Sequence, residues 1–240
     1  MSNTRRLLGI VLDKENCREN DQIIFFYTQE AGKIEILIRG GRKVNSKLAP
    51  IVAEPFALIR LVIVPGRNNF HLIGGEVEES FKDILQNEKK IIQINALFKK
   101  INKLVKTQSD SKIFPLILKF LERINEQPAE KIGIIISAFL IKFLTFLGYR
   151  PEIRRCLICS KIPLEKEIVF NPIKGGIVCL KHGLEPNDET GGIKINQGVL
   201  NILQKLLYRD FDYLISQDFD QKDLLAAGKT IKRFFNWHLS

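Results

Sequence analysis

Residues 22–41, QIIFFYTQEAGKIEILIRGG, hold two runs of β-branched and aromatic residues joined by a short polar link. Such runs are typical of strands, and Gly32 in the link suits a tight hairpin, which needs a residue with positive φ. Similar runs flank this stretch: LLGIVLD (7–13) precedes it, and FALIRLVIVP (56–65) and NFHLIGGEV (69–77) follow it. The sequence therefore predicts five strands within residues 1–80.

The connection after the third strand, GGRKVNSKLAPIVAEP (40–55), is longer than the hairpin link. Five strands with one longer excursion after the third are compatible with a Greek-key barrel of the OB type. An SH3-like barrel would give nearly the same strand count, so the strand pattern alone leaves both open.

After Glu79 the apolar residues change to a helical period. One apolar stripe with lysines opposite predicts a lysine-rich helix from Lys82 to Lys106. Further helical segments are FPLILKFLERIN (114–125), 131–147, a segment that Asn196 could cap and one that Asp220 could cap. The most apolar stretch, 132–149, contains Lys142 and is marginal for a membrane span, so it favours a buried helix.

Three of the four cysteines and one histidine form the pattern C-x2-C-x19-C-x2-H at Cys156, Cys159, Cys179 and His182. The intervening residues predict a short hairpin, and two such knuckles joined by a hairpin are typical of a zinc ribbon. Four protein ligands leave no open position on the ion, so we expect one structural Zn²⁺ per chain rather than a catalytic metal. The alternative is a reduced thiol cluster without metal.

These patterns together predict an α+β protein. An N-terminal five-stranded OB-fold β-barrel (1–80) is followed by an all-helical domain (81–240) with an inserted zinc-ribbon-like hairpin at about 152–190.

The net charge of +10 is unevenly distributed. Residues 81–155 hold 15 Lys and Arg against 7 Asp and Glu, whereas the segments on either side are each close to balance. A local basic excess favours a polyanionic partner. The alternative is a chain that is simply rich in lysine.

A glycine-containing basic loop, RGGRKVNSK (39–47), carries Arg39, Arg42, Lys43 and Lys47. Basic side chains neutralise phosphates, so this loop is a candidate DNA contact, with a merely solvated turn as the alternative. Nearby aromatics could stack on bases, but their continuous apolar run favours the core; they are Phe25, Phe26, Tyr27 and Phe56.

Several motifs in order resemble the bacterial recombination mediator family RecO. They are GIVLD (9–13), ENDQIIFFYTQEAGKIEILIRGGRKVNSKLAP (19–50), EPF (54–56), FLGYRPEIRRCLICSK (146–161) and the GGIVCLKH knuckle. The resemblance spans nearly the whole chain. One departure is His182, where many members have a fourth cysteine.

The resemblance implies an OB-fold joined to a helical domain with a zinc element. It implies a protein that binds single- and double-stranded DNA, anneals complementary strands and contacts the C-terminal tail of SSB. It also implies action with RecR, and in many bacteria RecF, to place RecA on SSB-coated DNA, with no membrane partner. The matched positions are Arg39, Arg42, Lys43 and Lys47 for DNA, and Cys156, Cys159, Cys179 and His182 for zinc.

No enzymatic site is predicted. The segment GKT (228–230) lacks the upstream glycine and the preceding strand of a phosphate-binding loop. The aspartates between 210 and 223 could suggest a two-metal nuclease, but they lie in a polar connection where helix capping explains them. The N-terminus does not resemble a signal peptide, so we expect a cytoplasmic, nucleoid-associated bacterial protein. The alternative function is a zinc-containing structural adaptor with incidental nucleic-acid binding.

Overall fold

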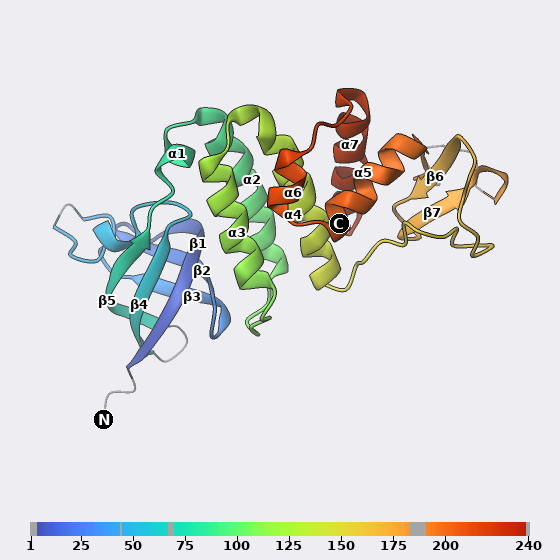
Figure 1. The fold of residues 1–240 in the computed structure, drawn as a ribbon. Helices are drawn as coiled ribbons and strands as arrows, with labels where there is room; N and C mark the ends of the chain where they lie inside the picture. Colours follow the sequence, from blue (N-terminus) through green and yellow to red (C-terminus); the bar gives the residue numbers. More distant parts are fainter. Residues whose placement is uncertain (1–3, 44, 67–69, 183–190, 239–240) are drawn as a thin grey trace. The chain divides into compact units, whose positions relative to one another are not determined.

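The computed structural model of the chain describes residues 4–43, 45–66, 70–182 and 191–238. The chain divides into two compact units, residues 1–129 and 130–240. The first unit contains a β-barrel and three α-helices, and the second contains four α-helices and a small sheet (Figure 1).

Five strands close into the barrel of the first unit: β1 (Arg5–Cys17), β2 (Asp21–Thr28), β3 (Gly32–Ile38), β4 (Leu58–Pro65) and β5 (Phe70–Glu79). Their order around the barrel is β1-β2-β3-β5-β4, with β3 parallel to β5 and the other pairs antiparallel. This closed Greek-key order confirms the OB-type barrel and excludes the SH3-like alternative.

Every second side chain along a strand points into the barrel and fills its interior. Along β3 the side chains of Ile34, Ile36 and Ile38 are buried, while Glu35 between them faces water. At the β2–β3 hairpin, Gly32 has a φ of +68°, as the sequence predicts. The four aromatics considered for base stacking are buried, which confirms their assignment to the core: Phe25, Phe26, Tyr27 and Phe56.

Three helices follow the barrel in this unit, α1 (Lys82–Leu85), α2 (Glu88–Leu104) and α3 (Ile113–Glu126), and the 3-10 turn η1 (Pro50–Val52) lies in the long connection. The single helix expected from Lys82 to Lys106 is wrong. The side chain of Asn87 accepts a hydrogen bond from the N–H of Lys90 and starts a separate helix, α2. An N-cap residue has extended backbone, so the two helical segments cannot be continuous.

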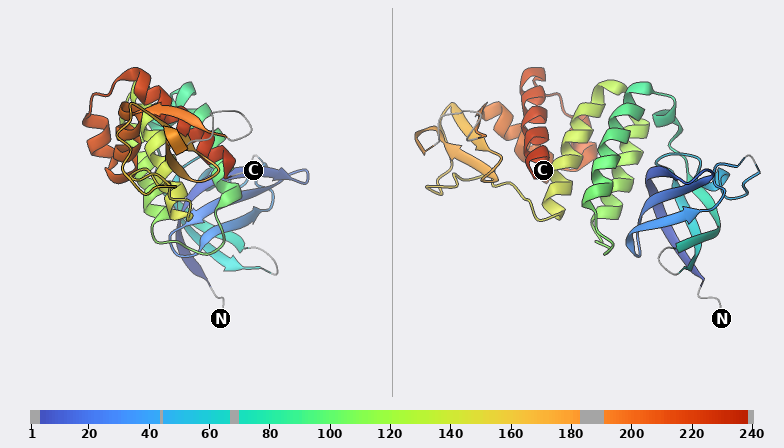
Figure 2. Two further views of the ribbon diagram at one scale, coloured as in Figure 1. Left: turned by 90° about the vertical axis from the view of Figure 1, so that its right-hand side faces the viewer. Right: turned by 180° about the vertical axis from the view of Figure 1, so that it is seen from behind.

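The helix α2 packs on the barrel. Phe98 of α2 meets Phe56 edge to face with ring centroids 5.2 Å apart and stacks on Phe120 of α3 at 6.3 Å. Lys33 of β3 donates from Nζ to the carbonyl of Asn102 at 2.8 Å, near the C-terminus of α2. The right-hand view of Figure 2 shows α2 and α3 side by side, next to the barrel.

In the second unit α4 (Ile132–Phe146) is surrounded by other helices, α5 (Gln197–Tyr208), α6 (Phe211–Ser216) and α7 (Gln221–Trp237); the short turn η2 (Ala129–Lys131) precedes it. Eleven of its 15 residues are buried, so α4 is the core helix that the sequence predicts. Within the described residues, no helix has both the length and the apolar character that crossing a membrane requires.

The predicted caps of this unit are confirmed. Asn196 accepts a hydrogen bond from the N–H of Val199 at the start of α5, and Asp220 accepts one from the N–H of Asp223 at the start of α7. Both side chains satisfy backbone donors that have no partner within the helix.

A small sheet carries the cysteine cluster. Its strands are β6 (Glu167–Asn171), β7 (Gly176–Cys179) and β8 (Ile193–Asn196), in the order β7-β6-β8, and the turn η3 (Leu180–His182) follows β7. The predicted hairpin is therefore present as β6 and β7, and β8 is a third strand that the sequence pattern did not indicate.

Candidate nucleic-acid interface and metal centre

The ligand atoms of Cys156, Cys159, Cys179 and His182 all lie within 4.8 Å of one another. Cys159 Sγ is 3.8 Å from Cys179 Sγ, and Cys156 Sγ is 3.9 Å from His182 Nδ1. In a tetrahedron with Zn–S bonds of about 2.3 Å the ligand atoms stand about 3.8 Å apart. The four residues therefore fit one tetrahedral metal ion.

Backbone geometry builds the first knuckle. The N–H of Ser160 donates to the carbonyl of Cys156 at 2.9 Å, and the N–H of Cys156 donates to the carbonyl of Lys161 at 2.8 Å. Ser160 has a φ of +59°, which lets the chain reverse directly after Cys159. The turn thus points both thiols of the C-x2-C pair to the same side.

The second knuckle is held against the first by β7. The N–H of Cys179 donates to Cys156 Sγ at 3.3 Å, and the N–H of Leu157 donates to the carbonyl of Ile177 at 2.9 Å. A Cβ at Gly176 would lie 2.5 Å from the carbonyl oxygen of Glu152, so this close approach requires glycine.

Electrostatics at Cys156 favour its thiolate. Burial by itself raises the pKa of the thiol, but the N–H groups of Cys159, Cys179 and Ile158 and the ring of His182 stabilise the anion and lower the pKa to about 6. A thiolate is the form that ligates a metal. Three soft thiolates and one imidazole form a complete donor set, which suits a structural ion and leaves no position for a substrate.

The four basic residues of the loop at 39–47, here called the basic loop, are all exposed: Arg39, Arg42, Lys43 and Lys47. Three of them, all but Arg42, line a hollow of about 680 Å³. Arg42 instead turns to the β1–β2 turn, where its N–H donates to the carbonyl of Asn20 at 3.0 Å and its Nη1 to the carbonyl of Glu19 at 3.2 Å.

A fifth basic residue, Arg18, lines the same hollow from the β1–β2 turn. Its side chain is 79% exposed. It was not among the predicted site residues, because it stands alone between polar residues in the sequence and no local motif marks it. The pairing of β2 with β3, in which Gln22 lies opposite Ile38, brings the β1–β2 turn and its Arg18 to the basic loop.

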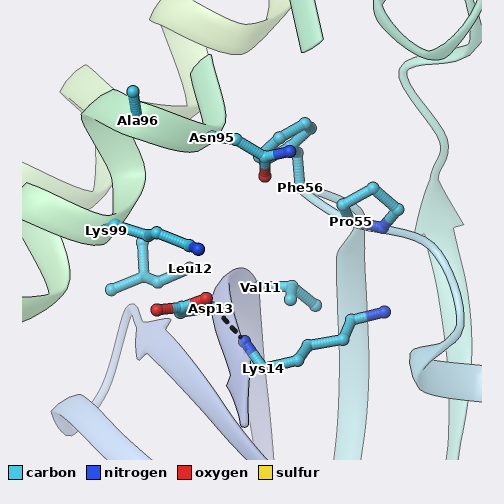
Figure 3. A pocket seen from close by; sticks show the side chains of 9 residues that line it. All are labelled: Val11, Leu12, Asp13, Lys14, Pro55, Phe56, Asn95, Ala96 and Lys99. Carbon is cyan, nitrogen blue, oxygen red and sulfur yellow. Dashed lines mark hydrogen bonds between the residues drawn. The ribbon is translucent and has the colours of Figure 1, made fainter. Parts of the chain in front are cut away.

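A second hollow, of about 520 Å³, lies between β1, the segment before β4 and the helix α2 (Figure 3). Figure 3 shows Lys99 of α2 near Asp13 of β1, while the side chain of Lys14 extends toward Pro55. Burial lowers the pKa of Lys14 to about 8, partly opposed by Glu54, and its Nζ donates to the carbonyl of Ala53. The other lining residues are Val11, Leu12, Phe56, Asn95 and Ala96.

The GKT segment and the aspartates between 210 and 223, which we considered as enzyme motifs, have structural roles. GKT (228–230) lies inside α7, where Thr230 is buried and donates to the carbonyl of Ala226. Asp210 and Asp220 are N-caps, and Asp223 accepts a hydrogen bond from Asn196. In the part of the chain that the structure describes, the cysteine cluster is the one grouping of three or more potential metal ligands found close together.

Comparison with known proteins agrees with this architecture. Residues 1–81 match the family described as Recombination protein O N terminal, and residues 102–240 match Recombination protein O C terminal. The DNA repair protein RecO of Acetivibrio thermocellus is 26% identical over 232 residues, which cover 96% of this chain and 90% of that protein. That of Symbiobacterium thermophilum is 24% identical over 204 residues, covering 84% and 79%.

The relative from Thermoanaerobacter sp. is 28% identical over 173 residues, covering 72% of this chain and 68% of that protein. The resemblance inferred from the sequence motifs is thereby confirmed. Since the two family matches cover both the barrel and the helical part with its cysteine cluster, the chain belongs to the recombination protein O (RecO) family.

Proposed function

We propose that this chain is a DNA-binding recombination mediator. It binds and anneals DNA strands and, with RecR and RecF, helps to load RecA onto SSB-coated single-stranded DNA. The observation that carries the DNA-binding part is the hollow where Arg18, Arg39, Lys43 and Lys47 meet on an OB-type barrel. Family membership supports the place of this activity in DNA repair.

Annealing on this surface requires no bond-making residue. Two DNA strands repel each other through their phosphates, and basic side chains that neutralise those phosphates lower the repulsion while holding the strands close. We therefore propose a non-enzymatic activity in which Arg39, Lys43 and Lys47 contact the backbone. Because the barrel aromatics are buried, base stacking on Phe25, Phe26, Tyr27 or Phe56 has no part in it.

The metal in this proposal is one structural Zn²⁺ held by Cys156, Cys159, Cys179 and His182. The three thiolates and the imidazole favour zinc, which is redox-inert and accepts tetrahedral coordination. Its contribution is to hold the two knuckles of the small sheet together, since few buried apolar residues surround the cluster.

We further propose the acidic C-terminal tail of SSB as a protein partner. The hollow between β1 and α2 has apolar walls, two lysines, Lys14 and Lys99, and one carboxylate, Asp13 (Figure 3). Its lining is therefore net basic, which suits a peptide with carboxylates and apolar side chains. We place the tail there, and we place the protein in the bacterial cytoplasm at the nucleoid, where its DNA substrate lies.

The second candidate is a structural adaptor that assembles other proteins and binds DNA only incidentally. One observation favours it: among the residues that the structure describes, six of the 13 exposed large hydrophobic side chains lie between residues 157 and 180, around the metal site. Apolar surface of this kind is typical of protein contacts. These residues are Leu157, Ile158, Ile162, Leu164, Ile173 and Leu180.

The experiment that decides is fluorescence-monitored annealing of complementary oligonucleotides, with and without SSB. If our proposal is right, the Lys43→Glu/Lys47→Glu variant should lose most of the annealing rate of the unmodified protein. If the chain is an adaptor, the variant and the unmodified protein should anneal at the same slow rate. Incubation of labelled DNA with the protein and Mg²⁺ is the companion test, and cleavage of the DNA would contradict the non-enzymatic proposal.

A further inference from the structure

The β1–β2 turn and the basic loop are joined by hydrogen bonds. Besides the two bonds that Arg42 gives to Asn20 and Glu19, the N–H of Gly40 donates to Oδ1 of Asp21 at 2.8 Å. All three bonds have their donors in the loop and their acceptors in the turn. The two segments, about 20 residues apart in sequence, therefore form one connected surface.

The turn in this connection contains Arg18. The backbone of Arg18 has a φ of +54°, a left-handed conformation that is costly for a side chain larger than glycine. Its guanidinium is 4.0 Å from Oδ2 of Asp21, whose other oxygen accepts the bond from Gly40. Asp21 thus links the cation of the turn to the backbone of the basic loop.

The hollow between the two segments has at least one cationic side chain on each side. Arg18 lines it from the turn, and Arg39, Lys43 and Lys47 line it from the basic loop. Two carboxylates, Glu19 and Asp21, also line it, so the lining carries a net charge of +2. The remaining polar groups include Asn20, Asn45 and Ser46, which can donate hydrogen bonds to an oxyanion.

We propose that the β1–β2 turn and the basic loop form a two-sided clamp for a DNA backbone phosphate. In this clamp Arg18 contacts the phosphate opposite Lys43 and Lys47. Arg42 is a positioning residue that braces the turn against the loop through its bonds to Asn20 and Glu19. The clamp deepens the proposed DNA-binding function and rests on it. It gives a phosphate contact to Arg18, for which the sequence alone suggests no role, and a positioning role to Arg42, which the sequence alone suggests as a DNA contact.

Charge and hydrogen-bond geometry favour a phosphodiester over a base in this site. The lining has no exposed aromatic side chain on which a base could stack, whereas cations and amides on two facing segments can surround an anionic oxygen. Binding at this site is therefore expected to be insensitive to DNA sequence and strongly dependent on salt.

The first test is the Arg18→Gly variant. Glycine tolerates the positive φ, so this change removes the guanidinium without straining the turn. Binding of the variant to a fluorescent oligo(dT) should weaken several-fold, and the slope of log K against log salt should fall by about 0.7, the value of one single-strand phosphate contact. Arg5→Gly is the matched control, because Arg5 is an exposed arginine at the opposite end of β1.

The second test addresses Arg42 through a double-mutant cycle. Arg42→Ala should weaken binding in the unmodified protein but have little further effect when Arg18 is already glycine, because it acts through the turn. Additive losses would show instead that Arg42 contacts DNA independently. An oligonucleotide with uncharged methylphosphonate linkages should reduce the difference between the Arg18→Gly variant and the unmodified protein.

These results separate the clamp from the proposed function. If Lys43→Ala and Lys47→Ala weaken binding while Arg18→Gly has the same effect as Arg5→Gly, the clamp is wrong and DNA binding by the basic loop stands. If none of these variants changes oligo(dT) binding, both the clamp and the proposed DNA interface are wrong.

Discussion

Cys156 Sγ lies 3.9 Å from His182 Nδ1, although 26 residues separate them in the chain. A distance of this length is an edge of a zinc-sized tetrahedron, and Cys159 and Cys179 supply a matching edge of 3.8 Å. The two knuckles meet because β6 and β7 pair in register between Ile168 and Cys179. The β6–β7 hairpin and the candidate metal site are therefore parts of one local structure.

The first prediction concerns this site. Cys159→Ser should reduce bound zinc from about one equivalent per chain to nearly none, because three ligands hold the ion far more weakly than four. Hydrogen exchange at β6 and β7 should become faster at the same time, since binding energy of the metal is also folding energy there. Elemental analysis and exchange mass spectrometry measure the two effects.

Two further variants serve as references for the metal prediction. Cys17→Ser changes a cysteine outside the cluster and should leave the zinc content unchanged. His182→Cys should retain zinc, since a fourth thiolate is an equally suitable ligand. Purified protein without zinc, or a Cys159→Ser variant that keeps a full equivalent, would contradict the assignment.

Sequence reasoning was most successful where the signal is local. One local signal is the spacing of the cluster, and the structure brings its four residues together: Cys156, Cys159, Cys179 and His182. The other is helix capping within a few residues, which the structure confirms for Asn196 and Asp220. The strands of the barrel were also predictable, because apolar and polar residues alternate with a period of two along a half-buried strand.

Features that depend on distant contacts were not predictable in the same way. The break before α2 was missed because the apolar stripe continues through Asn87, whose capping role depends on the local backbone. The strand β8 has only four residues, too few to show a period, and pairs with β6 across 22 or more residues. Arg18 lies beside the basic loop through the pairing of β2 with β3 and the hydrogen bonds that the loop donates to the turn.

The second prediction concerns the basic loop. Charge reversal in Lys43→Glu/Lys47→Glu should slow annealing of complementary oligonucleotides about tenfold or more and make DNA binding less dependent on salt, because two phosphate contacts become repulsive. The fold should be unaffected, since both side chains are exposed. Stopped-flow annealing at two salt concentrations and circular dichroism measure these outcomes.

A suitable control for charge reversal is Lys166→Glu/Lys174→Glu. Both lysines are exposed and lie between the two pairs of the cysteine cluster, and their substitution changes the net charge by the same amount. An equal loss of annealing in this control would show that total charge, and not the basic loop, determines the rate.

The third prediction concerns the start of α2. Asn87→Ala removes the acceptor for the N–H of Lys90 and should lower the free energy of unfolding by about 1 kcal/mol, as measured by urea denaturation. Asn87→Asp keeps an acceptor oxygen and should retain most of the stability. A loss in the aspartate variant as large as in the alanine variant would show that capping is not the cause.

The fourth prediction concerns Lys142, a partly buried lysine of α4. The Nζ of Lys142 donates to the carbonyl of Leu207 at 3.0 Å, near the C-terminus of α5. Burial lowers the pKa of Lys142 from 10.5 to about 8, an effect that the charge of Asp210 partly opposes. The folded state therefore releases this proton at a lower pH than the unfolded state does.

The sign of the pH dependence follows from this order. Between about pH 8 and pH 10.5 the unfolded state binds more protons at this side chain than the folded state, so stability rises with pH in that window. In Lys142→Met this contribution is absent. The free energy of unfolding of the unmodified protein, minus that of the variant, should therefore increase from pH 7.5 to pH 10. Taking the difference cancels the titration of other groups, including Lys14. Urea denaturation at four pH values measures it, and a difference that stays constant or falls would mean that Lys142 keeps an ordinary pKa in the folded protein.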